Sequence, residues 1–87
     1  MPSCIKHLIS GFNKENFCNK GVKVERYTFQ SKTVYGFNPG TCGADMTSEV
    51  IDSECQNMGF LGGIAGNTEI NGEDFSLAIF ESVVWKK

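Results

Sequence analysis

The chain has 87 residues and a formal net charge of −2 from ten acidic and eight basic side chains. This length suits one domain and excludes two, so we expect a single domain over residues 1–87. The near balance of charge excludes a basic surface for nucleic acid or an anionic membrane. No apolar run approaches the roughly 20 residues that cross a membrane as a helix, which excludes a transmembrane segment.

Four cysteines, Cys4, Cys18, Cys42 and Cys55, are the most informative residues. An even number in a chain of under about 100 residues is typical of a disulfide framework. Zinc is disfavoured because no Cys-x-x-Cys motif occurs and the chain has one histidine. We favour sequential pairing, Cys4–Cys18 and Cys42–Cys55, in which each bridge closes a loop of about 14 residues and stabilises the fold by about 3 kcal/mol. Four buried free thiols are the alternative.

The predicted disulfides also indicate the compartment in which the protein resides. Disulfides persist in oxidising environments, so we expect an exported protein, periplasmic or extracellular. The sequence begins Met-Pro-Ser-Cys without a charged and apolar leader. We therefore expect that a signal peptide was removed and that Met1 does not belong to the mature chain. The sequence leaves open whether the precursor carries a lipid anchor.

The first predicted element is an amphipathic helix over residues 3–13. Ile5, Leu8, Ile9 and Phe12 recur at the spacing of one buried helical face. This face is expected to pack on the sheet that the rest of the chain predicts.

A β-hairpin follows the helix. Residues 22–30 and 33–37 predict its strands, and Ser31-Lys32 predicts its turn. In the first strand, two valines and two aromatic residues have opposite phases of alternation, so we expect a bulge at residues 25–26 that brings all four to one face. The Asn-Pro-Gly sequence at residues 38–40 predicts a turn whose glycine has positive φ.

The second half of the chain predicts shorter elements. Residues 49–52 predict a strand, residues 59–66 are apolar and rich in glycine, and residues 67–72 predict a turn. Residues 75–85 fit a helix or a strand, and their β-branched and aromatic ending favours a strand. The elements together predict an α+β fold, with one N-terminal helix packed on an antiparallel sheet of four or five strands and stapled by disulfides.

Carboxylates in one loop are candidate metal ligands. Asp45, Glu49, Asp52 and Glu54 could bind calcium, which prefers carboxylate and carbonyl oxygens. Their spacing does not match the twelve-residue calcium loop, so a solvated acidic loop is the simpler interpretation. A glycosidase with paired carboxylates is disfavoured because a chain this small has little wall for a sugar cleft. Apart from this weak calcium hypothesis, we expect no cofactor.

A nucleophile would have to come from Cys4 and His7. They lie three residues apart on the predicted helix, so a thiolate–imidazole pair is geometrically allowed. A disulfide at Cys4 would abolish that chemistry. We therefore expect no catalytic residue and no enzymatic activity.

An apolar partner surface is the other candidate site. Phe60, Leu61 and Ile64 lie among glycines and could form an exposed loop that docks a protein or glycan partner. Four other large aromatic residues could form a binding surface for a sugar or a protein, but most of them are expected in the core, because a small sheet has little else to bury. These aromatic residues are Tyr27, Tyr35, Phe37 and Trp85.

A resemblance to a known family covers nearly the whole chain. It rests on Val34-Tyr35, residues 38–46, Glu49-Val50, Cys55, residues 59–64 and Trp85, together with residues 2–5 and 27–30. In these segments the chain resembles a family of small uncharacterised bacterial secreted or lipoprotein-type domains. The resemblance implies an exported domain with bridged cysteines and implies no activity. Related sequences often carry a cysteine beside the position of Cys42, where this chain has Thr41 and Gly43.

The sequence thus predicts a small, exported, disulfide-stabilised domain that acts as a non-enzymatic binding or structural module. A calcium-dependent module that uses residues 45–54 is one alternative. A secreted protease inhibitor is another, because loops pinned by disulfides resist cleavage. No pattern in the sequence predicts an oligomeric state.

Overall fold

A computed structural model describes residues 1–15, 18–43 and 46–87. Its elements in chain order are α1 (Ser3–Glu15), β1 (Val22–Phe29), β2 (Lys32–Pro39), β3 (Thr47–Asp52), β4 (Asn57–Gly62), β5 (Glu69–Ile70), β6 (Glu73–Asp74), the 3-10 turn η1 (Phe75–Leu77) and β7 (Ile79–Lys86). Five strands form an antiparallel sheet in the order β4-β3-β2-β1-β7, and β5 pairs with β6. The predicted α+β fold is confirmed. No helix in the described residues is long and apolar enough to cross a membrane.

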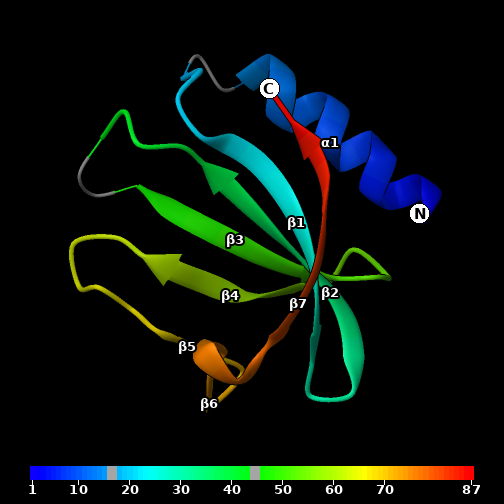
Figure 1. Cartoon of the computed structure of the whole chain (residues 1–87), viewed down its shortest axis with the longest axis vertical. Helices are drawn as coiled ribbons and strands as arrows, with labels where there is room; N and C mark the ends of the chain where they lie inside the picture. Colours follow the sequence, from blue (N-terminus) through cyan, green and yellow to red (C-terminus); the bar gives the residue numbers. More distant parts are fainter. Residues whose placement is uncertain (16–17, 44–45) are drawn as a thin grey trace.

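Helix α1 and the β5–β6 hairpin lie at opposite ends of the molecule, with the main sheet between them (Figure 1). Ile5 and Ile9 of α1 are buried against one face of the sheet, where they meet Val24, Phe37 and other residues of the first core cluster. Phe12 extends that contact, with its ring edge-on to Phe37 at 5.4 Å between centroids. The periodicity therefore predicted the helix correctly, although Leu8 lies at its exposed margin.

The β1–β2 hairpin differs from its prediction by one residue. Phe29 pairs with Lys32, so the turn consists of Gln30 and Ser31 and not of Ser31-Lys32. Both turn residues have positive φ, 52° and 62°, as in the type I′ turn that matches the twist of paired strands. The side chain of Gln30 is held by Asn71, whose Nδ2 donates to Gln30 Oε1 at 2.9 Å and whose carbonyl accepts from Gln30 Nε2.

The predicted bulge in β1 is wrong. The β1–β2 ladder is regular, and it places Val24 on the face under α1 and Tyr27 and Phe29 on the opposite face. Both phases can be apolar because β5, β6 and η1 cover part of that second face. The register shifts lie instead in the β1–β7 ladder, where β7 carries an extra residue on each side of the Glu25–Arg26 pair.

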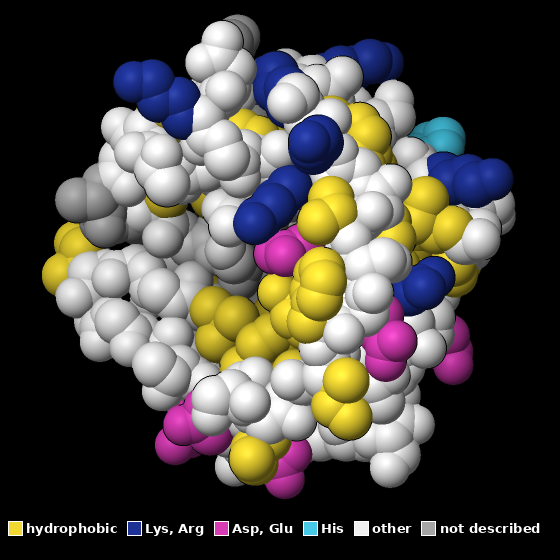
Figure 2. All heavy atoms as spheres, viewed as in Figure 1, with side chains coloured by type: hydrophobic (Ala, Val, Ile, Leu, Met, Phe, Trp, Pro, Cys, Tyr) yellow, Lys and Arg dark blue, Asp and Glu magenta, His cyan; other side chains and the backbone are white. Residues whose placement is uncertain are grey.

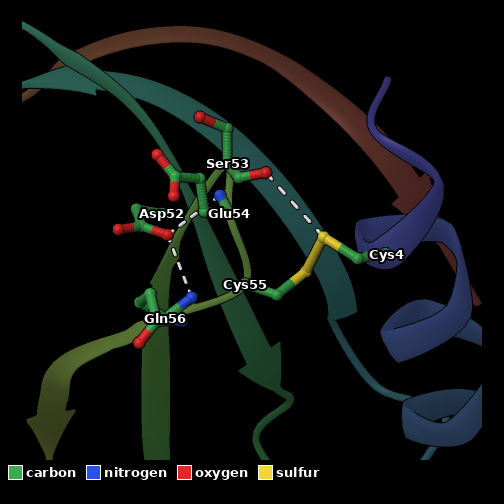
Figure 3. The surroundings of a disulfide bond; sticks show 6 residues. All are labelled: Cys4, Asp52, Ser53, Glu54, Cys55 and Gln56. Carbon is green, nitrogen blue, oxygen red and sulfur yellow. Dashed lines mark hydrogen bonds between the residues drawn. A yellow bond between two sulfur atoms is a disulfide. The ribbon is translucent and has the colours of Figure 1, made fainter.

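The disulfides join distant elements, and the predicted sequential pairing is wrong. Cys4 is bonded to Cys55, and Cys18 is bonded to Cys42. The reason is the path of α1, which places Cys4 beside the β3–β4 turn (Figure 3). The segment after the helix then runs beside the loop after β2, where Thr41 N donates to the Lys20 carbonyl at 2.9 Å.

Gly40, predicted to have positive φ, has φ of 92° and lies where these two segments meet. A Cβ atom there would lie 2.5 Å from the Lys20 carbonyl oxygen and 2.9 Å from Cys18 Sγ. Only glycine therefore allows this close approach.

Candidate functional site

The face of the sheet opposite α1 is covered along only part of its length. Ile70 of β5 packs there against Phe29, Val34 and Val50 to form a second core cluster. Beyond this cover lie two adjoining hollows of about 440 and 110 Å³, which share Tyr27, Leu61 and Phe75. The other lining residues are Glu25, Gly36, Asn38, Ser48, Asn67, Thr68, Asp74, Ser76 and Ala78. We call these two hollows together the sheet groove.

The floor of the sheet groove is apolar. Figure 2 shows hydrophobic side chains gathered in a hollow near the centre of the view, with charged side chains at its rim. Phe80 and Val83 of β7 lie across from Tyr27 and Glu25 in the β1–β7 ladder, so they extend this apolar surface toward the sheet edge. They are 53% and 46% exposed. The groove is thus an open aromatic surface and not a closed cavity.

Tyr27 lies at the centre of the groove. Its ring is edge-on to Phe75 at 5.0 Å and to Phe80 at 5.8 Å. Gly36 of β2 pairs with Glu25 and lies beside the Tyr27 ring. A Cβ atom at Gly36 would lie 3.3 Å from Tyr27 Cε1. The absence of a side chain at Gly36 therefore gives the tyrosine ring room on the sheet surface.

The hydroxyl of Tyr27 is held by a carboxylate. It donates to Glu25 Oε1 at 3.2 Å, and Glu25 Oε2 lies 3.7 Å from Lys23 Nζ. Burial, the negative charge of Glu25 and this hydrogen bond raise the pKa of Tyr27 to about 12. At neutral pH the tyrosine is therefore an uncharged donor, and the charge at this end of the groove belongs to Glu25.

A second carboxylate, Asp74, lies at the other end of the groove. Its Oδ1 accepts from Ser76 N at 2.8 Å, which caps η1. Hydrogen bonds from the backbone and side chain of Ser76 lower the pKa of Asp74. Neither hollow is lined by lysine or arginine among the residues that the structure describes. The groove is therefore aromatic in its middle and has a carboxylate at each end, and Lys23 offsets part of the charge of Glu25.

The three residues of the predicted partner surface do not lie together. Leu61 lines the sheet groove and packs against the second core cluster. Phe60 pairs with Glu49 and faces the side of the sheet that carries α1, because neighbouring residues of a strand point to opposite faces. Ile64 lies in the turn after β4 and is 91% exposed. Of this predicted surface, only Leu61 belongs to the groove.

The acidic segment orders the β3–β4 turn. Asp52 Oδ1 accepts from the backbone N–H groups of Glu54 and Gln56, each at 2.9 Å, and so fixes the turn that carries Cys55 (Figure 3). Glu49 Oε2 accepts from Asn57 Nδ2 at 2.7 Å on the opposite face of the sheet. Asp45 lies outside the described residues. Within residues 1–15, 18–43 and 46–87, no three histidine, cysteine or acidic side chains are grouped to hold a metal ion.

The structure also decides the state of the only predicted nucleophile. Cys4 is in a disulfide with Cys55, so its sulfur is not a thiolate that His7 could activate. His7 is exposed and lines a shallow hollow of about 380 Å³ beside that bridge.

Sequence reasoning missed most of the groove. It favoured the core for Tyr27, with an aromatic binding surface as the alternative, and did not single out Glu25, Phe75 or Phe80. The signal was the alternation in β1, because Glu25, Tyr27 and Phe29 share a phase opposite to that of Val24. Interpreted without a bulge, this pattern predicts a sheet with two apolar faces and one carboxylate among aromatic rings.

Comparison with known proteins gives a family and no function. Searches of curated proteins and of solved structures found no match. The model of a domain of unknown function, DUF6970, matches residues 10–87. The chain belongs to this family.

Proposed function

We propose that the protein is an exported, disulfide-stabilised binding module that holds a partner in the sheet groove and catalyses no reaction. The observation that carries this proposal is the open apolar surface formed by Phe80, which is half exposed, with the partly exposed side chains of Tyr27, Phe75 and Leu61. A small domain gains stability by burying such rings, so leaving them accessible is typical of an interaction surface. The larger hollow, about 440 Å³, is also within the range of ligand sites.

The ionisation of the groove favours binding over catalysis. General acid–base catalysis is most effective when a group titrates near the working pH. The pKa of Tyr27 is raised to about 12 and that of Asp74 is lowered, so both groups titrate far from neutrality. Both are also held by hydrogen bonds within the protein. They suit fixed recognition of a partner better than proton transfer.

The disulfides support the proposal of export. Each bridge joins elements that are distant in sequence, with separations of 51 and 24 residues, as expected of structural crosslinks. Such bonds persist in the periplasmic or extracellular space. Intact mass under non-reducing conditions tests this, since two disulfides make the chain about 4 Da lighter than its reduced form. The full reduced mass in protein never exposed to reductant would overturn the proposal.

The binding proposal is tested by filling the groove. Peptide ligands are first selected from a displayed random library on the wild-type domain, and their affinity is measured by calorimetry. Ser48 lines the groove, whereas Thr47 is exposed and faces the other side of the sheet. We expect Ser48→Tyr to weaken binding at least tenfold and the matched control Thr47→Tyr to leave it unchanged. Equal binding by both variants, or no selected ligand at all, would overturn the proposal.

The calcium-dependent module is a weaker alternative. Glu49 and Asp52 already accept hydrogen bonds on opposite faces of the sheet, which disfavours a shared ion. Calorimetry and thermal melting with millimolar calcium chloride test it directly. The absence of both heat and a melting shift would dispose of this alternative.

A further inference from the structure

The charge distribution in the sheet groove indicates what kind of partner fits it. The two carboxylates of the groove, Glu25 and Asp74, come from separate elements and lie at its two ends. The side chain of Glu25 is only 16% exposed, so its charge is screened less by water than that of a surface carboxylate. A positively charged ligand side chain is therefore favoured beside Glu25 where it replaces Lys23, whose ammonium pairs with this carboxylate in the free protein.

Lys23 marks the position of a cation in the free protein. Its ammonium lies 3.7 Å from Glu25 Oε2, and its side chain is more than twice as exposed as that of Glu25, 38% against 16%. Glu25 is mostly buried, but Lys23 is exposed enough for its ammonium to move into water when another cation takes its place. Since Tyr27 occupies the other oxygen, Oε1, the position next to Oε2 is where a ligand cation would replace the lysine.

The surroundings of that position suit a cation on an apolar stem. The rings of Tyr27, Phe75 and Phe80 form one cluster, and aromatic faces attract guanidinium and ammonium groups. Phe80 and Val83 continue the apolar surface along β7, where the neighbouring side chains of an extended segment would lie.

We propose that the sheet groove binds an extended segment of a partner protein, in which an arginine or lysine is flanked by apolar residues. The basic side chain pairs with Glu25 over the aromatic rings and displaces Lys23. This inference rests on the proposed function, because it names the chemistry of the partner for the same groove.

The test uses two labelled five-residue peptides, one with a central arginine between leucines and the other with citrulline, its uncharged isostere. Fluorescence anisotropy measures both affinities. We expect the arginine peptide to bind about tenfold more tightly, as for a charge-assisted contact. Sodium chloride should reduce this preference in the wild-type protein.

Two neighbouring variants should change the affinity in opposite directions. Glu25→Gln should abolish the preference for arginine, because the amide still accepts from Tyr27 but carries no charge. Lys23→Gln should tighten binding of the arginine peptide about threefold, because it removes the internal competitor. The matched controls, Glu54→Gln and Lys6→Gln, change exposed charges outside the groove and should leave the preference intact. Circular dichroism and the salt series on the wild type guard against a variant that fails to fold.

The outcomes separate this inference from the proposal on which it rests. Suppose that both peptides bind equally well and that Ser48→Tyr abolishes this binding. That result would overturn the proposal of a basic partner segment and would support the groove as a binding surface. Binding of neither peptide, while a library-selected ligand still requires the groove, would do the same. If no ligand of any kind requires the groove, both proposals are overturned.

Discussion

The two faces of the main sheet are covered in different ways. One face carries the 13-residue helix α1, and Cys4 within the helix and Cys18 beyond it are both covalently tied to the sheet region. The other face carries two-residue strands and a 3-10 turn, beyond which the sheet groove is open. Both faces bury a core cluster, but the covalent ties to the helical segment lie on one face, whereas the shorter cover of the other leaves part of the sheet open for contact.

The partial cover of the second face is itself anchored. The side chains of Gln30 and Asn71 join the β1–β2 turn to the β5–β6 turn, and Ile70 is fully buried beneath them. Phe75 follows β6 directly in the chain and lines one side of the groove. The wall is therefore held in place although the cover is short.

The largest expected effect concerns the covalent ties of the helical face. The double variant Cys4→Ser, Cys55→Ser should lower the free energy of unfolding by about 4 kcal/mol, because the bridge closes a loop of about 50 residues. Urea denaturation measures this change. Removal of Cys18–Cys42, which closes a shorter loop, should cost about 3.5 kcal/mol. A loss below about 1 kcal/mol for the Cys4–Cys55 variant would show that α1 does not depend on its covalent tie.

Paired truncations on the two faces should separate stability from binding. Ile5→Ala should cost about 3 kcal/mol because Ile5 is fully buried under α1, and it should leave the affinity of a groove ligand unchanged. Phe80→Ala should cost less than about 1 kcal/mol, because its ring is half exposed, and should weaken binding several-fold. Denaturation and calorimetry on both variants check this. The reverse pattern would contradict the division between the faces.

Tyr27 should report the electrostatics of the open face. The chain has two tyrosines, so in Tyr35→Phe the tyrosinate absorbance follows Tyr27 alone. Its midpoint should lie near pH 12, and Glu25→Gln should lower it only in part, because burial is the largest cause of the raised pKa. Because the folded pKa is raised, the stability that this group contributes is full below pH 10 and is lost as the pH rises toward 12. An unchanged midpoint when Glu25→Gln is added to the Tyr35→Phe protein would show that Glu25 does not hold the hydroxyl.

The smallest expected effect is local to η1. Asp74→Ala removes the acceptor of the Ser76 N–H, so this amide should exchange with solvent several-fold faster. In the wild type the pKa of Asp74 is lowered, so its contribution is present above the usual carboxyl range and is lost as the pH falls through the folded value. Amide exchange by NMR measures both changes. Unchanged exchange of Ser76 would rule out the cap.

The sequence predicted what depends on neighbouring residues. The spacing of Ile5 and Ile9 predicted α1, and the positive φ of Gly40 is confirmed, although Asn38 and Pro39 belong to β2 and not to a turn. The disulfide pairing could not be obtained in this way, because it depends on where α1 crosses the sheet. The turn at Gln30 was displaced for a similar reason, since its partner Asn71 lies 41 residues away.

The groove was not predicted because the valines and the aromatic residues of β1 were expected on the same face of the sheet. Its lining comes from β1, β2, β3, β4, β6, η1 and the segment before β5, and no short motif joins those segments. Placing Tyr27 and Phe29 on the same face as the valines required a bulge in β1, but the β1–β2 ladder is regular. Strict alternation, together with apolar residues in both phases, was the available signal.

The most direct test of the division between the faces is a ¹⁵N–¹H NMR titration with a peptide selected on the wild-type domain. Amide shifts should concentrate at Glu25, Tyr27, Ser48, Leu61 and Ser76, and the amides of α1 should stay in place. Shifts that concentrate on α1 and leave the groove unchanged would contradict the assignment of the open face to binding.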